Sequence, residues 1–389
     1  MDYFRRLGAE VERRWLEVDR DDEAFPTIAQ AALAALPPSE HFEREAFLDH
    51  ELDPLAPARR ERAPLGVFGQ PGATVYFGRE FVIEVYFWVE CISGVHDHPF
   101  KGIFTILEGE SVHARYSWTD DDGPKGRMRT GALALEAVEL VRAGEHRLFS
   151  KQDHALIHSL IHVTVPSISM VVRTARGQGY MRFEPPSLCL TYEDLDQVIA
   201  RQVALFDSLR AVADPRYVER LVDYLERADL ETCFHLLKGA WPVADDESRG
   251  LLLTPVRRRH GERADELERA LVQTVRIGQS YALRAQLRDP DDRLVATALL
   301  VAEKRDDVLS LLGEKHDDPI ARLHRFVDEF GVALTGDEAT AGATHRLVDG
   351  GGREAFVRHL GECFGEAEIT GQLGQIERFL TESVFAPLT

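Results

Sequence analysis

Apolar residues recur with a helical period in the first fifty positions of the chain. Four of them are spaced four apart, as on one face of a helix: Tyr3, Leu7, Val11 and Trp15. A second, alanine-rich helix is expected over 27–36, and the prolines at 37 and 38 would end it. The following segment, 52–64, contains three prolines and three arginines, which is typical of a linker.

From residue 65 to about 190 the pattern changes to short runs of β-branched and aromatic residues, separated by glycine and proline. The runs predict strands at 73–77, 81–89, 103–107, 111–118, 133–141, 146–148, 155–165, 167–173 and 180–183. Many short strands in one stretch of chain are typical of an antiparallel sandwich or barrel.

After residue 192 the helical period returns and holds almost to the end. Beyond two helices near 195–206 and 218–225, the pattern predicts helices at 262–277, 281–287, 293–303, 306–312, 319–330 and 371–385. The glycine-rich segment 335–352 is expected to be a loop among them. We find no repeat of fixed period.

These helical and strand-like patterns predict an α+β chain of several domains, in keeping with a length of 389 residues. The expected division is an N-terminal helical segment with its linker at 1–62, a β-domain at 63–191, and a large all-α domain at 192–389. The helical domain offers surfaces through which a protein partner, or a second copy of the chain, would bind.

Charge and cysteine usage narrow the function classes. Lysine and arginine number 46 against 66 acidic residues, a net charge of −20, so nucleic acid and membrane surfaces are not expected partners. No window approaches about 18 uninterrupted apolar residues, and the N-terminus lacks the apolar core of a secretory signal. The four cysteines are scattered without CxxC spacing, which favours a reduced cytoplasmic location.

Two histidines separated by one residue, His96 and His98, lie between two apolar, strand-like runs. In an extended chain they share a face, with Cα atoms roughly 6.6 Å apart, so both rings can reach one metal ion. Seven of the fifteen histidines fall between His96 and His162. Imidazole-rich sites suit iron, copper, nickel or zinc, so the pattern predicts a transition-metal site in the β-domain.

The residues from 96 to 109 resemble the first motif of the cupin superfamily, with His96, His98, Gly102 and Gly109 in register. Metal cupins commonly have glutamate where Gly102 stands, whereas the cysteine dioxygenase-like branch has glycine or cysteine there. The apolar run ending in Trp88, followed by glycine and Val-His-Asp-His, is similar to the lead-in of that branch. The resemblance covers about 73–173 and implies a double-stranded β-helix barrel.

The second cupin motif is less closely matched. Gly144 leads to His158, which takes the ligand position, while His162 replaces the usual asparagine. On a regular strand His158 and His162 are about 13 Å apart, so without a bulge only one of them can bind the ion. We expect His158 as the third ligand, with His162 and then His154 as the alternatives.

What the resemblance implies is a mononuclear Fe(II) dioxygenase, or one using another first-row metal, with three neutral histidine ligands. Its substrate would be a small molecule that chelates the metal through a thiolate or enolate, with O₂ as co-substrate. The cysteine and tyrosine that form a thioether in some members of the branch are not found, nor is its outer histidine near Val171. Cysteine itself is therefore not assigned as substrate.

Three further side chains are candidates for a catalytic role. Arg173, ahead of Arg79, is a candidate for gripping a substrate carboxylate. His113 is a candidate for a hydrogen bond that fixes the tautomer of a ligand. His162, if it is not a ligand, would be a general base.

Two alternatives to the oxygenase remain. One is a non-catalytic, metal- or ligand-binding cupin whose helical half is an interaction module. The other is a metal-dependent isomerase or lyase that uses His162 as its base.

Overall fold

The computed structural model describes residues 2–55, 69–89, 94–121, 126–149, 156–175, 181–191 and 195–389. The chain is α+β, with two five-stranded antiparallel sheets and many helices among these residues. His154, Cys91, most of the predicted linker and the ends of two predicted strands lie outside the described residues. No helix among the described residues is long and apolar enough to cross a membrane. The described cysteines are free: Cys189, Cys233 and Cys363.

The contacts divide the chain into two compact units built from interleaved segments. The first unit comprises 1–116, 136–180 and 287–297, and the second comprises 117–135, 181–286 and 298–389. The division of the chain into domains at 1–62, 63–191 and 192–389 stays a prediction.

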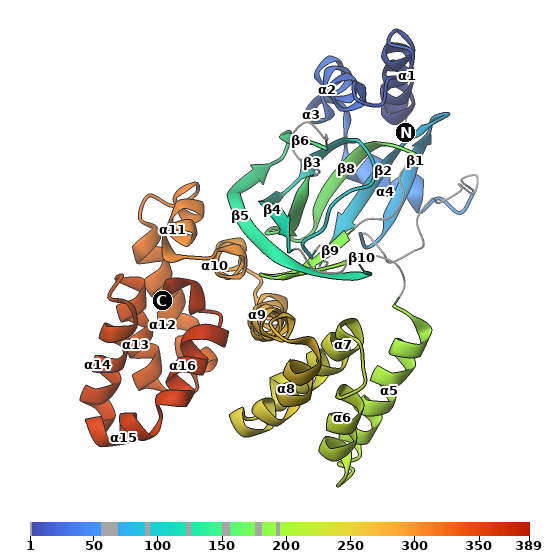
Figure 1. The fold of residues 1–389 in the computed structure, drawn as a ribbon. Helices are drawn as coiled ribbons and strands as arrows, with labels where there is room; N and C mark the ends of the chain where they lie inside the picture. The colour runs from blue at the N-terminus through green and yellow to red at the C-terminus, as the bar shows by residue number, and fades with distance from the viewer. Residues whose placement is uncertain are drawn as a thin grey trace. The chain divides into compact units, whose positions relative to one another are not determined.

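The first unit holds a sheet of order β1-β2-β8-β3-β6 (Figure 1). Its strands are β1 (Gly72–Phe77), β2 (Phe81–Trp88), β3 (Gly102–Glu108), β6 (His146–Phe149) and β8 (Ser167–Thr174). All four neighbouring pairs are antiparallel. Every residue of β2 is buried, which explains why that run lacks the alternation of a strand with one solvated face.

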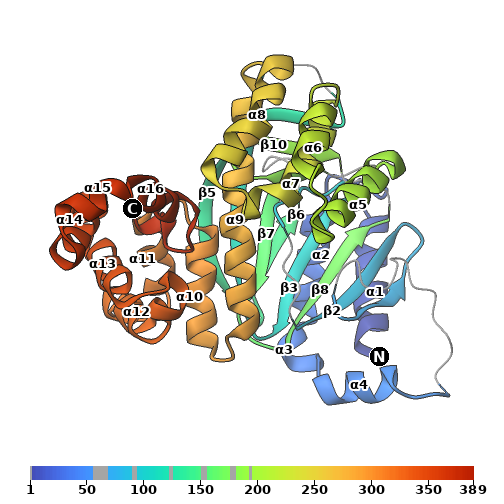
Figure 2. The ribbon, with the colours of Figure 1, turned by 90° about the horizontal axis from the view of Figure 1, so that it is seen from below.

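Two N-terminal helices, α1 (Asp2–Leu16) and α2 (Phe25–Ala35), cover this sheet (Figures 1 and 2). The predicted stripe of α1 is buried, and Trp15 packs edge-on against both Phe25 and Phe81. Burial of each such side chain is worth about 1.5–3 kcal/mol. The short helices α3 (Pro38–His41) and α4 (Arg44–Glu51) follow.

The second sheet has the order β7-β4-β5-β10-β9. Its strands are β4 (Glu110–Asp120), β5 (Met128–Arg142), β7 (Ile157–His162), β9 (Met181–Glu184) and β10 (Leu188–Thr191). In the first unit β4 pairs antiparallel with β7, placing Arg115 opposite His158. The antiparallel sheets agree with the predicted β-architecture, and the closure of a barrel stays a prediction.

A piece of the helical half of the chain belongs to the first unit. Residues 287–297 include the start of α10 (Pro290–Val301), where Arg293 is buried. Its Nε donates a hydrogen bond of 2.8 Å to the carbonyl of Val163, directly after β7. The strand that carries His158 and His162 is therefore fastened at its end by a residue about 130 positions further along the chain.

The second unit is mainly helical. Its first helices are α5 (Gln197–Ala211), α6 (Tyr217–Leu225), α7 (Leu230–Ala240), α8 (Asp246–His260) and α9 (Arg263–Gln286), with the 3₁₀ turn η2 (Trp241–Val243) after α7. Their apolar faces share a core with Met128, Leu188 and Leu190. The predicted break after residue 277 is wrong, because α9 runs continuously through Gly278.

The remaining helices of this unit are α11 (Arg305–Gly313), α12 (Pro319–Thr335), α13 (Glu338–Val348), α14 (Gly352–Phe364), α15 (Glu366–Gly371) and α16 (Leu373–Glu382), ending in η3 (Ala386–Leu388) (Figure 2). The predicted loop at 335–352 is wrong, since most of it is α13. Asp337 caps the N-terminus of that helix by accepting a 2.8 Å hydrogen bond from the amide of Thr340. Leu347 and Val348 are buried on the same helix.

Candidate metal centre

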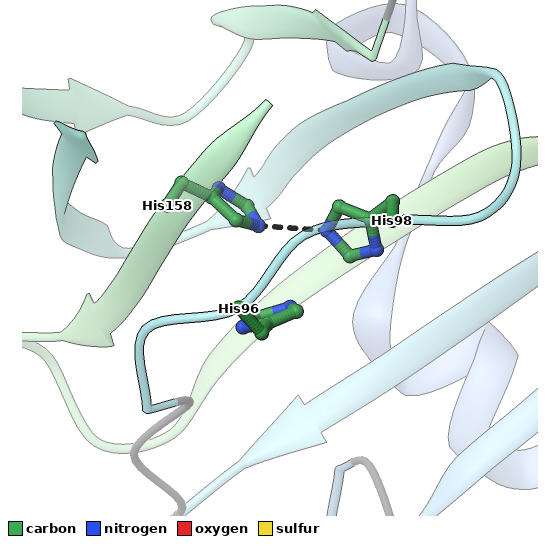
Figure 3. A group of neighbouring side chains, drawn as sticks. All are labelled: His96, His98 and His158. Atoms are coloured by element: carbon green, nitrogen blue, oxygen red, sulfur yellow. Dashed lines mark hydrogen bonds between the residues drawn. The ribbon is translucent and has the colours of Figure 1, made fainter. Parts of the chain in front are cut away.

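Three histidines from two parts of the chain meet in the first unit. His96 and His98 lie in the segment between β2 and β3, and His158 lies near the start of β7. A pair of backbone hydrogen bonds of 2.9 Å joins His96 to His158 in an isolated antiparallel bridge. Figure 3 shows the three rings turned toward a common point. The bridge thus brings the sequence-adjacent pair to a histidine some sixty residues away.

The three rings have the spacing of ligands on one metal ion. One nitrogen from each lies within 4.8 Å of the others, and Nε2 of His98 is 2.8 Å from Nε2 of His158. The ring centres are 4.6 to 4.9 Å apart. Three imidazoles bound at about 2.1 Å on one face of an octahedral ion would have centres roughly 4.6 Å apart, and at tetrahedral angles roughly 5.3 Å. The observed spacing falls between these values and nearer the first.

Hydrogen bonds at the opposite nitrogens orient two of the rings. Nδ1 of His96 is 2.7 Å from the carbonyl of Gly94, and Nδ1 of His158 is 2.9 Å from Nε2 of His113. The nitrogen that each of these rings offers to an ion is therefore Nε2. Partners of this kind fix the tautomer and direction of metal-binding histidines in general.

Burial keeps these imidazoles in the form that binds metals. It lowers the pKa of His96, although the bond to Gly94 acts in the other direction. Burial also lowers the pKa of His98 and His158 well below the usual range, and the neighbouring histidines add to this. Neutral imidazole is the form that binds a metal ion, so burial of the cluster favours metal binding over protonation.

Aromatic side chains border the cluster. The ring of His98 lies 4.6 Å from that of Phe100 and 4.4 Å from that of Phe149. Phe104 and Phe149 also lie within 6.0 Å of the ring of His158. An apolar border of this kind keeps the local dielectric low and strengthens electrostatic interactions at the cluster.

Gly102 begins β3 where metal cupins commonly have a carboxylate. A Cβ atom added there would lie 2.2 Å from the carbonyl oxygen of Val172 and 2.8 Å from Cα of Arg173. The backbone of β8 therefore fills the space that a side chain would need. A carboxylate ligand has no room at this position, in keeping with a set of three histidines.

His113 is separate from the three-histidine group and contacts it through His158. It lies on β4, fully buried, with Nδ1 2.9 Å from Oε1 of Glu139. Burial lowers its pKa, while the bond to Glu139 acts in the other direction. It contacts Nδ1 of His158, the ring nitrogen opposite the one turned toward His98, and its tautomer-fixing role stays a prediction.

His162 lies four residues further along β7 than His158 and has different neighbours. Its Nδ1 is 2.8 Å from Oγ of Ser111 and 3.2 Å from Oγ of Ser167, and its ring stacks on Trp88 with centres 4.4 Å apart. It is buried and is not part of the three-histidine group. Of the two described candidates for the third ligand, the structure brings His158 to the pair.

Arg173 is already engaged by a protein carboxylate. Its Nε and Nη2 donate to the two oxygens of Glu84 at 2.6 and 3.1 Å, and its guanidinium lies 4.7 Å from the centre of the Phe100 ring. Tyr86 donates a third hydrogen bond to Glu84 at 2.9 Å. Arg79, the second candidate for gripping a substrate, is exposed at the turn between β1 and β2.

Sequence reasoning missed three charged residues near the cluster: Glu84, Glu139 and Arg147. Glu84 carried a readable signal, because it is the one charge in the apolar run 81–88 and its side chain is almost fully buried. A charge in such a run needs a partner, which is here Arg173. Glu139 and Arg147 lie on β5 and β6 in alternating, half-buried stretches. Charged residues are common in such strands, so the sequence gives no sign of their role.

Neither a family model nor a curated protein matches the chain. Structures of DMSP lyases align with 26% of it and 41% of their own chain, at 14% identity and a TM-score of 0.18. An uncharacterised protein with a double-stranded β-helix domain from Klebsiella pneumoniae aligns over 31% of this chain and 83% of its own, at 15% identity and a TM-score of 0.21. Hydroquinone 1,2-dioxygenase from Sphingomonas aligns over 30% and 70%, at 14% identity and a TM-score of 0.21.

The chain thus spans less than half the length of the first of these proteins. TM-scores near 0.2 establish neither a fold nor a function.

Proposed function

We propose that this chain is a mononuclear iron oxygenase of the cupin type, acting on a small substrate that chelates the metal. His96, His98 and His158 would hold ferrous iron, or another first-row metal. The single observation that carries the proposal is the convergence of these three rings at 4.6 to 4.9 Å between centres. Imidazole donors suit such metals better than calcium or magnesium.

The charges around the cluster favour an anionic substrate. The three ligands bring no negative charge, and two carboxylates near the cluster are each paired with an arginine, Glu84 with Arg173 and Glu139 with Arg147. A dication at this site would keep most of its charge, which attracts a thiolate or enolate. When bound, ferrous iron supplies open coordination positions and one-electron redox chemistry.

The role of Arg173 follows from its existing pair. With Nε and Nη2 held by Glu84, the guanidinium lies against the face of Phe100, which in turn contacts His98. Phe100 and Phe149 border His98 and limit the access of water. We propose that the main role of Arg173 is to keep Phe100 packed against His98 and to place a positive charge beside the substrate site.

A metal-dependent isomerase or lyase is the second candidate. It needs a base that is not a ligand, and His162 is a buried histidine outside the cluster. Its Nδ1 is engaged by Ser111 and Ser167 and its ring by Trp88, contacts that hold the ring in place. The geometry supports this role less than it supports metal binding.

A non-catalytic metal-binding module is the third candidate function, and the large helical part of the chain favours it.

The test loads the purified chain with Fe(II) under anaerobic conditions. Nitric oxide, an analogue of O₂ that needs an open coordination position, should give the EPR signal of a high-spin iron–nitrosyl. Oxygen uptake is then followed with panels of small thiols and β-diketones. His98→Ala should abolish both signals, whereas His50→Ala, which removes a histidine from α4, should leave both unchanged.

Each remaining outcome speaks against the proposal. Iron bound at one equivalent without a nitrosyl signal would mean that the ion has no open position for O₂. A nitrosyl signal without oxygen uptake in either panel would overturn the oxygenase and favour the isomerase or the binding module.

A further inference from the structure

We infer that Glu139, held by Arg147, sets the direction of a chain of hydrogen bonds that aims His158 at the metal. The inference rests on the proposed metal site and assigns a positioning role to two residues outside it. Oε1 of Glu139 lies 2.9 Å from Nδ1 of His113, and Nε2 of His113 lies 2.9 Å from Nδ1 of His158. The chain therefore runs from a carboxylate through two imidazoles to the ligand nitrogen.

The ionised carboxylate fixes where each proton lies. A carboxylate only accepts hydrogen bonds, so Nδ1 of His113 must carry a proton and donate it to Glu139. A neutral His113 then has a lone pair at Nε2, which can only accept. Nδ1 of His158 must therefore be the donor, and the lone pair of His158 is left at Nε2, on the side of His96 and His98.

The reverse direction would disable the ligand. If Nε2 of His113 carried the proton, it would donate to Nδ1 of His158. The proton of a neutral His158 would then be at Nε2, where it blocks an ion. Two proton patterns thus compete, and only the one anchored by an accepting group at Nδ1 of His113 leaves His158 able to bind.

Arg147 keeps Glu139 in its accepting state. Its Nε and Nη2 donate to both oxygens of Glu139 at 2.9 and 2.7 Å. Burial acts to raise the pKa of Glu139, but the bonds from His113 and Arg147 outweigh it and hold that pKa below its usual value. The arginine also offsets the negative charge, which reduces the tendency of His113 to take up a second proton.

The site is therefore supported by strands that carry none of the three ligands. His113 lies on β4, Glu139 on β5 and Arg147 on β6. Carboxylates that orient a metal-bound histidine change metal affinity by roughly tenfold to a hundredfold when removed. Here the carboxylate acts at one remove, through a second histidine.

The experiment measures the affinity of the full chain for Co(II) by competition with a chromophoric chelator, together with the visible spectrum of bound Co(II). Glu139→Met, which removes every hydrogen-bond acceptor from this side chain, should weaken binding by roughly tenfold to a hundredfold and alter the Co(II) bands. Glu136→Met, the same change at an exposed position on the same strand, should do neither. Urea unfolding of each variant checks that the fold is retained.

A double-mutant cycle separates a relay from two unrelated effects. If Glu139 acts through His113, then His113→Asn should weaken Co(II) binding about as much as Glu139→Met, and the double variant should be little worse than either. Additive losses, or unchanged affinity and spectrum in Glu139→Met, would overturn the inference. Failure of the metal site itself is recognised separately, because His98→Ala would then leave Co(II) binding unchanged.

Discussion

Gly102 on β3 lies so close to Val172 on β8 that a Cβ atom would be 2.2 Å from the carbonyl oxygen of Val172. Arg173, which follows Val172, pairs with Gly102 in the strand register and contacts Glu84 through its side chain. One close strand contact thus excludes a carboxylate at position 102 and places the arginine near His98. The absence of a fourth protein ligand at this position is a consequence of backbone packing.

Gly102→Ala should therefore destabilise the protein, since the clashing atoms are backbone and the strands must separate. We expect a loss of about 1–3 kcal/mol in the free energy of unfolding by urea, the usual cost of overpacking. Gly94→Ala is the matched control, because no atom lies within 4 Å of the added Cβ. Equal effects of the two substitutions would contradict this account of position 102.

Gly102→Glu tests whether the close contact between β3 and β8 prevents a carboxylate at position 102 from binding the metal. If β8 leaves no room, the new carboxylate cannot become a fourth ligand, and Co(II) affinity should not rise. A tighter complex with a changed Co(II) spectrum would show that the strand contact can open.

Arg173→Gln should cost about 3–5 kcal/mol of unfolding free energy, because it leaves the carboxylate of Glu84 buried without a counter-ion. The double variant Glu84→Gln/Arg173→Gln removes both charges and should recover much of that loss. If Arg173→Gln keeps full stability, the pair with Glu84 is not a structural requirement. That result would favour a role for Arg173 in binding a substrate carboxylate.

His162→Ala should leave metal binding at one equivalent per chain while destabilising the fold. The substitution removes the ring from Trp88 and leaves the hydroxyls of Ser111 and Ser167 without its nitrogen. We expect a loss of roughly 1–3 kcal/mol in a urea unfolding series. Loss of the metal in this variant would make His162 a ligand.

The metal-free protein should lose stability as the pH falls below about 6.5. Burial lowers the pKa of His96, His98, His113 and His158 in the folded state, so below the ordinary pKa the unfolded chain binds more protons than the folded one. The free energy of unfolding therefore decreases as the pH is lowered through this window.

Urea midpoints measured with a chelator present, from pH about 7.5 to about 5.5, check this dependence. The His98→Gln variant should have a flatter profile, since one of the imidazoles with a lowered pKa is gone. A midpoint that stays constant or rises toward acid in the unsubstituted chain would contradict the neutral, buried state of the cluster.

The sequence predicts the features that depend on residues close together in the chain. The spacing of His96 and His98 and the apolar run before them were enough to expect a metal site between strands. The helical stripe ending at Trp15 was likewise readable, because its burial follows from a period of 3.6. The glycine content of 335–352 predicts a loop, but Asp337 caps a helix there over 338–348.

The remaining features depend on strand register, which the sequence does not display. Arg173 reaches Glu84 because β2 and β8 pair with Val82 opposite Arg173, and the two residues are 89 positions apart. Glu139 reaches His113 only because β4 and β5 place them at hydrogen-bonding distance. Likewise, nothing near Arg293 in the chain indicates that its guanidinium binds the end of β7.

We propose that His96, His98 and His158 bind one transition-metal ion. A titration of the metal-free chain with Co(II), followed by the visible spectrum, tests this binding. We expect one equivalent bound with octahedral or five-coordinate bands, loss of that site in His96→Ala, His98→Ala and His158→Ala, and its retention in His162→Ala. Full Co(II) binding after alanine replaces all three histidines, or no binding by the unsubstituted chain, would contradict it.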